Sequence, residues 1–137
     1  MKIAVLGSIT IDLITKVPKI PHENEVVISE GLRLLPGGKA ANTAIALSRL
    51  GSDSYMLGKI GNDGFGKNIK MIFKNEKVNM DFVDIDYVVP TGTVLVNVDQ
   101  QGQNTIIVNE DANIRITTKS IANFLNKKVI SKLLISY

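Results

Sequence analysis

The 137-residue chain contains no cysteine and no tryptophan, and its aromatic residues make up only 5% of the sequence. Without cysteine, neither a disulfide framework nor a thiolate metal site can form. So few aromatic side chains also give no stacking platform for the bases of a nucleic acid. No stretch approaches the roughly 20 apolar residues of a membrane helix, and the N-terminal apolar run is too short for a signal peptide. We therefore expect a cytoplasmic protein that binds neither nucleic acid nor membrane.

A strong charge of one sign is also missing. Sixteen Lys and Arg are dispersed among thirteen Asp and Glu, for a formal net charge of +3, and 45% of the residues are hydrophobic. The lysines near the C-terminus are better interpreted as solvated helix faces than as a nucleic-acid surface. Neither a repeat nor a linker divides the chain. The composition is typical of one globular unit with a core of its own.

Strand and helix signals alternate along the chain. Continuous apolar runs at residues 3–6 and 129–137, and a shorter one at 54–58, are typical of strands buried on both faces. Between them the sequence predicts helices, with end signals at Gly51 and N-caps at Asp63 and Thr118. Buried strands separated by helices predict a parallel α/β core. The expected helices cover residues 40–50, 65–76 and 120–127.

A second group of strands shows a different pattern, in which apolar and polar residues alternate. This pattern predicts a small sheet with one face free of the core. The turn residues 100–103 separate two of these strands and indicate a hairpin. The expected strands lie near residues 12–17, 25–35, 93–99 and 104–109.

The segment 37–42, GGKAAN, opens the first predicted helix. Gly37 and Gly38 allow the backbone to approach a ligand closely, and the N–H groups of the first helical turn point toward that ligand. Lys39 adds a positive charge and Asn42 adds a donor and an acceptor one turn later. Such a segment suits a polyhydroxylated or anionic small molecule. From these six residues alone, an ordinary junction between a loop and a helix remains the alternative.

The wider spacing of small residues resembles the N-terminal half of the ribokinase-like (PfkB) carbohydrate kinases. Lys39 and the segments 102–106 and 112–113 are closest to the ribokinase branch. The resemblance implies an α/β fold in which a parallel sheet flanked by helices carries a small β-sheet lid. It also implies a homodimer formed through the lid. The residues that match the family signature are Gly37, Gly38, Asn42, Ala44, Gly51 and Gly61.

The resemblance also implies a sugar site. In it, Asp12 accepts hydrogen bonds from sugar hydroxyls, Val94 and Ile106 form an apolar wall, and Asn113 lies nearby. Taken without the resemblance, Asp12 is equally well a turn former at a strand end and Asn42 a helix cap. His22, the only histidine, is interpreted as a loop residue and not a base. The implied substrate-binding residues are Thr10, Asp12, Gly37, Gly38, Lys39, Asn42, Val94, Ile106 and Asn113.

Three positions depart from the family pattern. Thr10 stands where ribokinases usually carry Asn, and Asn24 and Asp111 stand where they usually carry Gly. These changes leave the sugar open: ribose, fructose, a 2-keto-3-deoxy acid and a nucleoside are all used on this scaffold.

The activity implied by the resemblance is transfer of the γ-phosphoryl group of ATP, with Mg²⁺, to a primary hydroxyl of a pentose or related sugar. Dependence on a monovalent cation stays open. The family's Gly-Ala-Gly-Asp motif, which carries the base, does not occur after Asn113, and no Walker motif is present. We therefore expect residues 1–137 to be the substrate-binding half, with the C-terminal half absent and no kinase activity of their own. The alternative is a non-catalytic module for sugar binding, nucleoside binding or oligomerisation.

Overall fold

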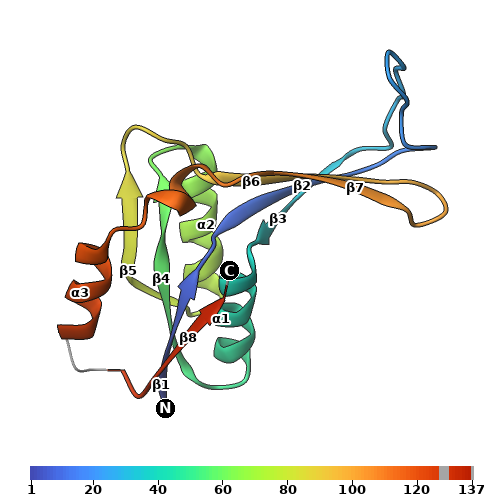
Figure 1. Cartoon of the computed structure of the whole chain (residues 1–137). Helices are drawn as coiled ribbons and strands as arrows, with labels where there is room; N and C mark the ends of the chain where they lie inside the picture. Colours follow the sequence, from blue (N-terminus) through green and yellow to red (C-terminus); the bar gives the residue numbers. More distant parts are fainter. Residues whose placement is uncertain (127–129, 137) are drawn as a thin grey trace.

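Two four-stranded sheets make up the computed structural model, which describes residues 1–126 and 130–136 (Figure 1). The core sheet has the order β5-β4-β1-β8 and all its strands are parallel. Its strands are β1 (Lys2–Gly7), β4 (Asp53–Gly61), β5 (Asn79–Asp86) and β8 (Lys132–Ser136). The lid sheet has the order β3-β2-β6-β7. Its strands are β2 (Thr10–Lys16), β3 (Leu32–Gly37), β6 (Gly92–Val98) and β7 (Asn104–Asn109).

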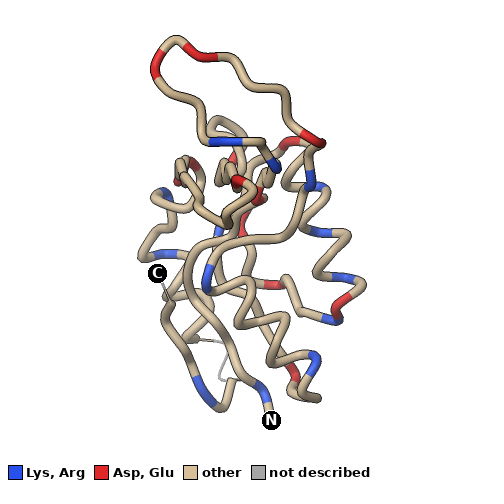
Figure 2. The backbone as a smooth tube through the Cα atoms, turned by 90° about the vertical axis from the view of Figure 1, so that its right-hand side faces the viewer, with Lys and Arg blue, Asp and Glu red and all other residues tan. Residues whose placement is uncertain are grey.

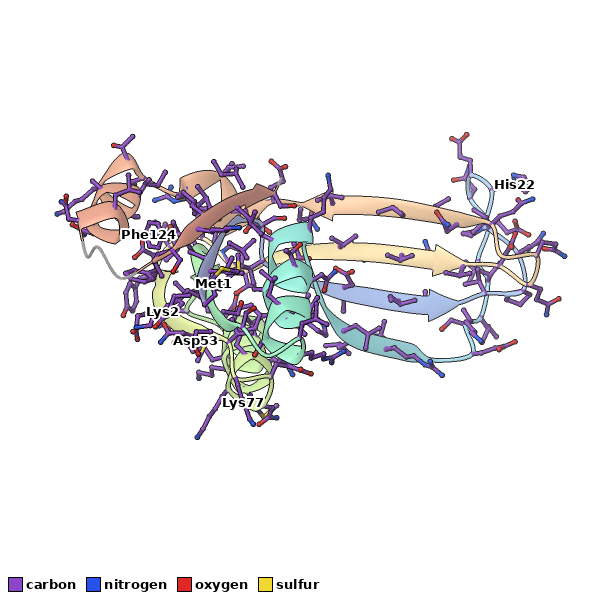
Figure 3. The ribbon with its side chains drawn as sticks, turned by 90° about the horizontal axis from the view of Figure 1, so that it is seen from below. Met1, Lys2, His22, Asp53, Lys77 and Phe124 are labelled. Carbon is purple, nitrogen blue, oxygen red and sulfur yellow. The ribbon has the colours of Figure 1, made fainter. Side chains whose placement is uncertain are left out.

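Helices cover both faces of the core sheet. The helices α1 (Lys39–Arg49) and α2 (Gly64–Asn75) pack on one face, where Val5 and Met56 meet Phe73. The helix α3 (Thr118–Asn126) packs on the other face, where Phe124 contacts Phe82 (Figure 3). Small residues of α1, such as Ala44, allow the helix to lie close against the sheet. The predicted parallel α/β core is confirmed.

The lid sheet projects away from the core (Figure 1). Its strand β2 pairs antiparallel with β3 and parallel with β6, and β6 pairs antiparallel with β7. The register places Asp12 opposite Val94, and Val94 opposite Val108, in one row of side chains. The adjacent row, on the other face of the lid, contains Leu34, Leu13, Leu95 and Ile107. The predicted second sheet is therefore present, with one face directed back toward α1.

One lid strand starts later than the sequence pattern suggests. The predicted strand 25–35 is observed only from Leu32. Its partner β2 ends at Lys16, so residues 25–31 have no neighbouring strand with which to pair. Val26 is consequently 91% exposed despite its high β-propensity. The strand β5 and the short 3₁₀ helix η1 (Asp111–Arg115) were not predicted at all. The aspartates of β5 conceal its alternation, since Asp86 is buried as an ion pair.

The helix ends test the capping signals. Gly51 follows α1, and the Asp63 carboxylate accepts a hydrogen bond from the backbone N–H of Gly66, as predicted. The cap assigned to Thr118 is wrong, because the hydroxyl of Thr117 accepts from the Ser120 N–H instead. The ends of two predicted elements, at residues 127, 129 and 137, lie outside the described residues.

Charged residues are spread along the molecule, with Lys and Arg distributed among Asp and Glu (Figure 2). No helix in the described part of the chain is long and apolar enough to cross a lipid bilayer.

Candidate functional site

The two glycines before α1 allow the helix to begin directly against the lid. Gly38 has a φ of +90°, a conformation that L side chains rarely adopt. A Cβ atom at Gly38 would collide with the carbonyl oxygen of Ser8, and one at Gly37 would collide with the carboxylate of Asp12. The close approach therefore requires glycine at both positions. It brings the first turn of α1 next to the start of β2.

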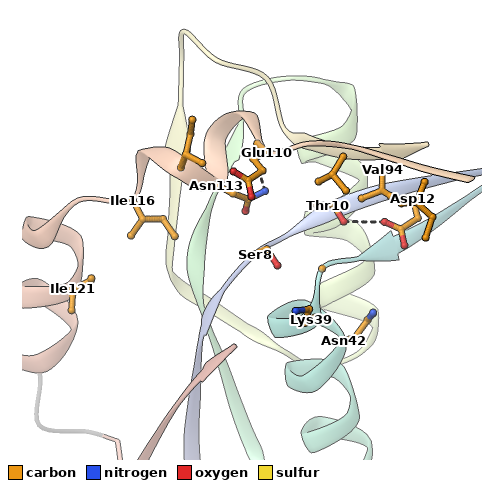
Figure 4. Close-up of a pocket in the computed structure, with 14 residues that line it drawn as sticks. Ser8, Thr10, Asp12, Lys39, Asn42, Val94, Glu110, Asn113, Ile116 and Ile121 are labelled. Carbon is orange, nitrogen blue, oxygen red and sulfur yellow. Dashed lines mark hydrogen bonds between the residues drawn. The ribbon is translucent and has the colours of Figure 1, made fainter. Parts of the chain in front are cut away.

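At the start of β2, two polar side chains are oriented toward each other. The hydroxyl of Thr10 donates a hydrogen bond of 2.9 Å to Oδ1 of Asp12 (Figure 4). Thr10 is buried, whereas Asp12 is half-buried. Thr10, which departs from the family's usual Asn, thus provides the hydrogen bond that holds the aspartate. The other carboxylate oxygen makes no hydrogen bond to the residues that the structure describes.

A pocket of about 900 Å³ lies between the lid, the start of α1 and η1 (Figure 4). Every residue of the predicted sugar site lines it except Gly37, which lies behind Asp12. Asp12 and Val94 come from the lid, whereas Lys39 and Asn42 come from α1. Ligand pockets in proteins are commonly of this size. The lining residues that were predicted are Thr10, Asp12, Gly38, Lys39, Asn42, Val94, Ile106 and Asn113.

Several other residues line the pocket without having been predicted. Val108 could have been found from its alternation with Ile106, two residues earlier on β7. Glu110 continues the same alternation beyond the strand end. No local signal marks the others: Ser8 lies in the short link between β1 and β2, and the isoleucines reach the pocket only through the packing of η1 and α3. The missed lining residues are Ser8, Val108, Glu110, Ile114, Ile116 and Ile121.

Asn113 lines the pocket, but its amide bonds the protein backbone. Its Oδ1 accepts from the Ile9 N–H at 2.8 Å, and its Nδ2 donates to the carbonyls of Ile9 and Glu110 at 2.9 and 3.0 Å. Both amide hydrogens are thus already used. The geometry favours a role in holding the site over direct donation to a ligand.

Two aspartates hold the loops beneath the lid. The carboxylate of Asp63 accepts from the backbone N–H groups of Gly66 and Thr91 and from the Thr91 hydroxyl, at 2.7 to 2.8 Å. Burial raises the pKa of Asp63, but these hydrogen bonds outweigh it and the net pKa is lowered. The pKa of Asp86 lies far below its ordinary value because the Val89 and Val88 N–H groups, then Arg115 and Lys59, stabilise its charge against desolvation. Neither aspartate lines the pocket, so both serve structure.

The two positions where glycine is replaced keep a glycine-like backbone. Asn24 and Asp111 have φ values of 60° and 46°. Asn and Asp visit this region more readily than other L residues. His22 lies in the exposed loop at the far end of the lid, distant from the pocket, which agrees with its interpretation as a loop residue (Figure 3).

Among residues 1–126 and 130–136, no group of three or more His, Asp or Glu is placed to hold a metal ion.

An α/β core that carries a β-sheet lid over a polar pocket is the architecture of the ribokinase-like fold. Solved structures agree with this. The ribokinase from Cryptococcus neoformans var. grubii in complex with ADP has a TM-score of 0.82 at 28% identity, covering 98% of this chain and 41% of that one. Arabidopsis thaliana ribokinase complexed with ribose and ATP has a TM-score of 0.75 at 32% identity, covering 82% and 36%.

Sequence comparisons lead to the same family. Residues 1–133 match the model of the pfkB family carbohydrate kinases. Ribokinase from Dictyostelium discoideum is 34% identical over 133 residues, and ribokinase from Bacillus subtilis is 35% identical over 125 residues. These alignments cover 97% and 91% of this chain and 42% of each relative. The chain thus belongs to the pfkB family of carbohydrate kinases and spans about two-fifths of the length of these relatives.

Proposed function

We propose that this chain is the sugar-binding part of an ATP-dependent sugar kinase. The complete protein would transfer the γ-phosphoryl group of ATP to a primary hydroxyl of a pentose or related sugar. One observation carries this proposal: Asp12 of the lid and Lys39 and Asn42 of α1 converge on one pocket from two separate elements. A small polyol is the ligand that such a mixture of acceptors and donors binds best.

Each part of the pocket has a distinct task in this proposal. Asp12 accepts hydrogen bonds from neighbouring sugar hydroxyls, and a charged acceptor makes the stronger bonds. Thr10 holds that carboxylate in place through its hydroxyl. Val94, Ile106 and Val108 form an apolar ceiling from the lid that would exclude water during transfer. The lid would thus both recognise the sugar and cover it.

The charges in the pocket favour a neutral sugar over a sugar acid. Two carboxylates, those of Asp12 and Glu110, and one ammonium group, that of Lys39, line it. A carboxylate on the ligand would meet more negative than positive charge in a partly desolvated site, which is unfavourable. We therefore favour ribose or a related neutral sugar over a 2-keto-3-deoxy acid.

A nucleoside is the second candidate ligand. Beyond the polar end, Ile114, Ile116 and Ile121 extend the pocket with apolar surface. A nucleoside could place its ribose at Asp12 and its base against these isoleucines. A nucleoside kinase from Methanocaldococcus jannaschii has a TM-score of 0.73 to this chain at 26% identity. Direct comparison of ribose with a nucleoside in a binding titration distinguishes the two.

The catalytic base and the sites for ATP and Mg²⁺ are proposed to belong to the part of the relatives' length that this chain does not cover. The described residues offer no metal site of their own. Mg²⁺ and ATP would supply and neutralise the transferred phosphoryl group, while Asp12 and its neighbours orient the sugar hydroxyl.

We also expect a homodimer formed through the lid. On the face opposite the pocket, Leu34, Leu95 and Ile107 lie in one row and are 45%, 40% and 58% exposed. A two-fold axis would bring this row against the same row of a second chain and cover both. The edge strand β8, where Ile135 is 67% exposed, is a second apolar surface that favours association. A monomer in light scattering at micromolar concentration would contradict the expectation.

The test of the proposed function compares two lengths of protein. The gene is read beyond codon 137, and the longest protein it encodes is assayed with ATP and D-ribose beside residues 1–137 alone. We expect an in-frame Gly-Ala-Gly-Asp motif and turnover by the longer protein only. Turnover by residues 1–137 would contradict the division of labour. Ribose binding without turnover by the longest protein would favour the binding module instead.

A further inference from the structure

Asn113 lies where three segments of the lid leave the core. Ile9, which it bonds through both the backbone N–H and the carbonyl, directly precedes β2. Glu110, whose carbonyl accepts from its Nδ2, directly follows β7. Gly92, the first residue of β6, packs so closely on the Asn113 amide that a Cβ atom there would collide with Nδ2. One side chain therefore contacts the core ends of β2, β6 and β7.

The amide is almost fully used by these contacts. Asn113 is only 6% exposed, and its two amide hydrogens and its oxygen all bond backbone groups of Ile9 and Glu110. If the Asn113 amide is removed, the buried backbone groups of Ile9 and Glu110 lose their hydrogen-bond partners. Leaving buried polar groups unpaired costs more free energy than the hydrogen bonds themselves contribute. No hydrophobic residue could replace these bonds, and the acidic analogue would place a carboxylate against two carbonyl oxygens. Position 113 therefore needs a side chain with both an acceptor and two donors, as an amide has.

The hydrogen bonds of Asp63 to Gly66 and Thr91, here called the Asp63 clamp, do not duplicate this role. Asp63 bonds Thr91, which precedes β6, and thereby ties that strand to the N-terminus of α2. Within residues 1–126 and 130–136, its carboxylate makes no hydrogen bond to the segments before β2 or after β7. The Ala112 N–H adds a bond to the Pro90 carbonyl, again on the β6 side. Of the side chains the structure describes, only that of Asn113 hydrogen-bonds the Ile9 backbone.

We propose that Asn113 is a positioning residue that fixes the lid over the sugar pocket. Thr10 and Asp12 lie one and three residues beyond the backbone that it holds. The orientation of Asp12 toward Lys39 and Asn42 thus depends on a side chain whose amide is already bonded to backbone groups. This inference rests on the proposed function, since it assigns Asn113 a part in sugar binding.

The test uses the variants Asn113→Asp and Asn113→Ala, with Asn109→Asp as the matched control. Asn109 makes the same kind of amide donation, to the Thr93 hydroxyl, but on the exposed lid surface. D-Ribose affinity is measured by calorimetric titration, and hydrogen exchange is measured separately for β2 and β7 of the lid and for β1 and β4 of the core. We expect both Asn113 variants to lose about tenfold or more in affinity. The Ile9 and lid amides should exchange about tenfold faster while core amides keep their protection, and the control should resemble the wild type.

Three results would overturn the proposal. Ribose affinity unchanged in both variants would show that Asn113 does not position the site. Equal loss of protection in core and lid, or failure of both variants to fold, would make Asn113 a residue of the whole fold. An equal loss of ribose affinity in Asn109→Asp would show that the loss in Asn113→Asp comes from the added negative charge and not from the position of Asn113. A wild-type chain that binds neither ribose nor a nucleoside overturns the proposed function itself, and the exchange data then still decide whether Asn113 orders the lid.

Discussion

The core sheet and the lid sheet contain the same number of strands, yet different forces hold them. In the core, Val5 and Leu57 are essentially buried, and helices cover both faces of the sheet. In the lid, Leu95 and Ile107 are largely exposed, and every residue of β7 is exposed. Burial of apolar surface therefore stabilises the core and the start of β2, where Ile11 is buried, whereas the rest of the lid depends mainly on strand pairing.

This difference suits the proposed function. A sheet that is anchored at its core end and stabilised elsewhere mainly by strand pairing can adjust at its free end without disturbing the core. The pocket residues proposed to bind the sugar are divided between the two regions, with Asp12 on the lid and Asn42 on the core. A lid that is held in place over the start of α1 would thus complete the site.

The largest contrast is expected for apolar truncations. Phe73 is fully buried between α2 and the core sheet, so Phe73→Ala should lower the free energy of unfolding by about 3–5 kcal/mol. Val26→Ala, in the lid loop where this side chain is 91% exposed, should change it by less than about 0.5 kcal/mol. Urea denaturation followed by circular dichroism measures both. Comparable losses would show that the lid carries as much of the stability as the core.

Removal of the lid carboxylate should affect binding and leave folding intact. Asp12→Ala should weaken sugar binding by about 2–4 kcal/mol, because hydroxyls buried in the pocket lose their charged acceptor. The loss in the free energy of unfolding should be smaller, about 1 kcal/mol, because the buried Thr10 hydroxyl loses its acceptor while the core is unchanged. Asp53→Ala, which removes an exposed carboxylate at the opposite end of the core sheet, is the control. Unchanged sugar affinity, or an unfolded variant, would make Asp12 a structural turn residue.

Loss of the Asp63 clamp should have an intermediate effect on stability. Asp63→Ala removes the N-cap of α2 and both bonds to Thr91, and we expect a loss of about 1–2 kcal/mol in the free energy of unfolding. Asp99→Ala, at the hairpin tip of the lid, removes a comparable set of turn bonds far from the core. Its effect on global unfolding should be smaller, and an equal effect would mean that lid and core unfold as one unit.

The same clamp predicts the dependence of stability on pH. Because the native pKa of Asp63 is lowered, the folded chain binds fewer protons than the unfolded chain near the ordinary aspartate value of 3.8. The stabilisation is therefore fully present above that value and is lost as the pH falls through the lower native pKa. Asp63→Asn should flatten the stability profile below about pH 4. A profile that keeps the slope of the wild type would contradict this origin.

The smallest effect is expected from relief of backbone strain. Asp111→Gly, at the junction of core and lid, should raise the free energy of unfolding by about 0.5 kcal/mol, because glycine tolerates the positive φ at this position. Asn24→Gly relieves a similar φ at the tip of the lid loop. There it should leave global unfolding unchanged, since the loop opens independently of the core. An equal gain at both positions would again indicate one cooperative unit.

The sequence pattern predicted elements whose signals are local. The glycine pair before α1, the end of that helix at Gly51 and the cap at Asp63 all depend on residues within one turn of each other. The strand β5 was missed because Asp86, which is charged and buried, contradicts the usual pattern until its partner Arg115 is seen 29 residues away. The predicted strand at residue 25 was too long because no local signal shows where its neighbour β2 ends.

The residues that line the pocket likewise fall into those that local sequence signals indicated and those that only the packing revealed. Asp12 and Asn42 were placed at the pocket by the family resemblance, because the motifs that carry it lie near the starts of their own elements. Ile116 and Ile121 were not, since they reach the pocket only when η1 and α3 pack against the core.

By itself, the amino-acid sequence determined which segments form the three α-helices, where α1 and α2 begin and which glycines permit a close approach, because these properties depend on neighbours along the chain. Only the tertiary structure decided that Asn113 is a clamp and not simply a lining residue, because its partner Ile9 lies 104 positions away. A hydrogen bond between such distant residues depends on how two sheets meet, and no periodicity within either segment specifies that.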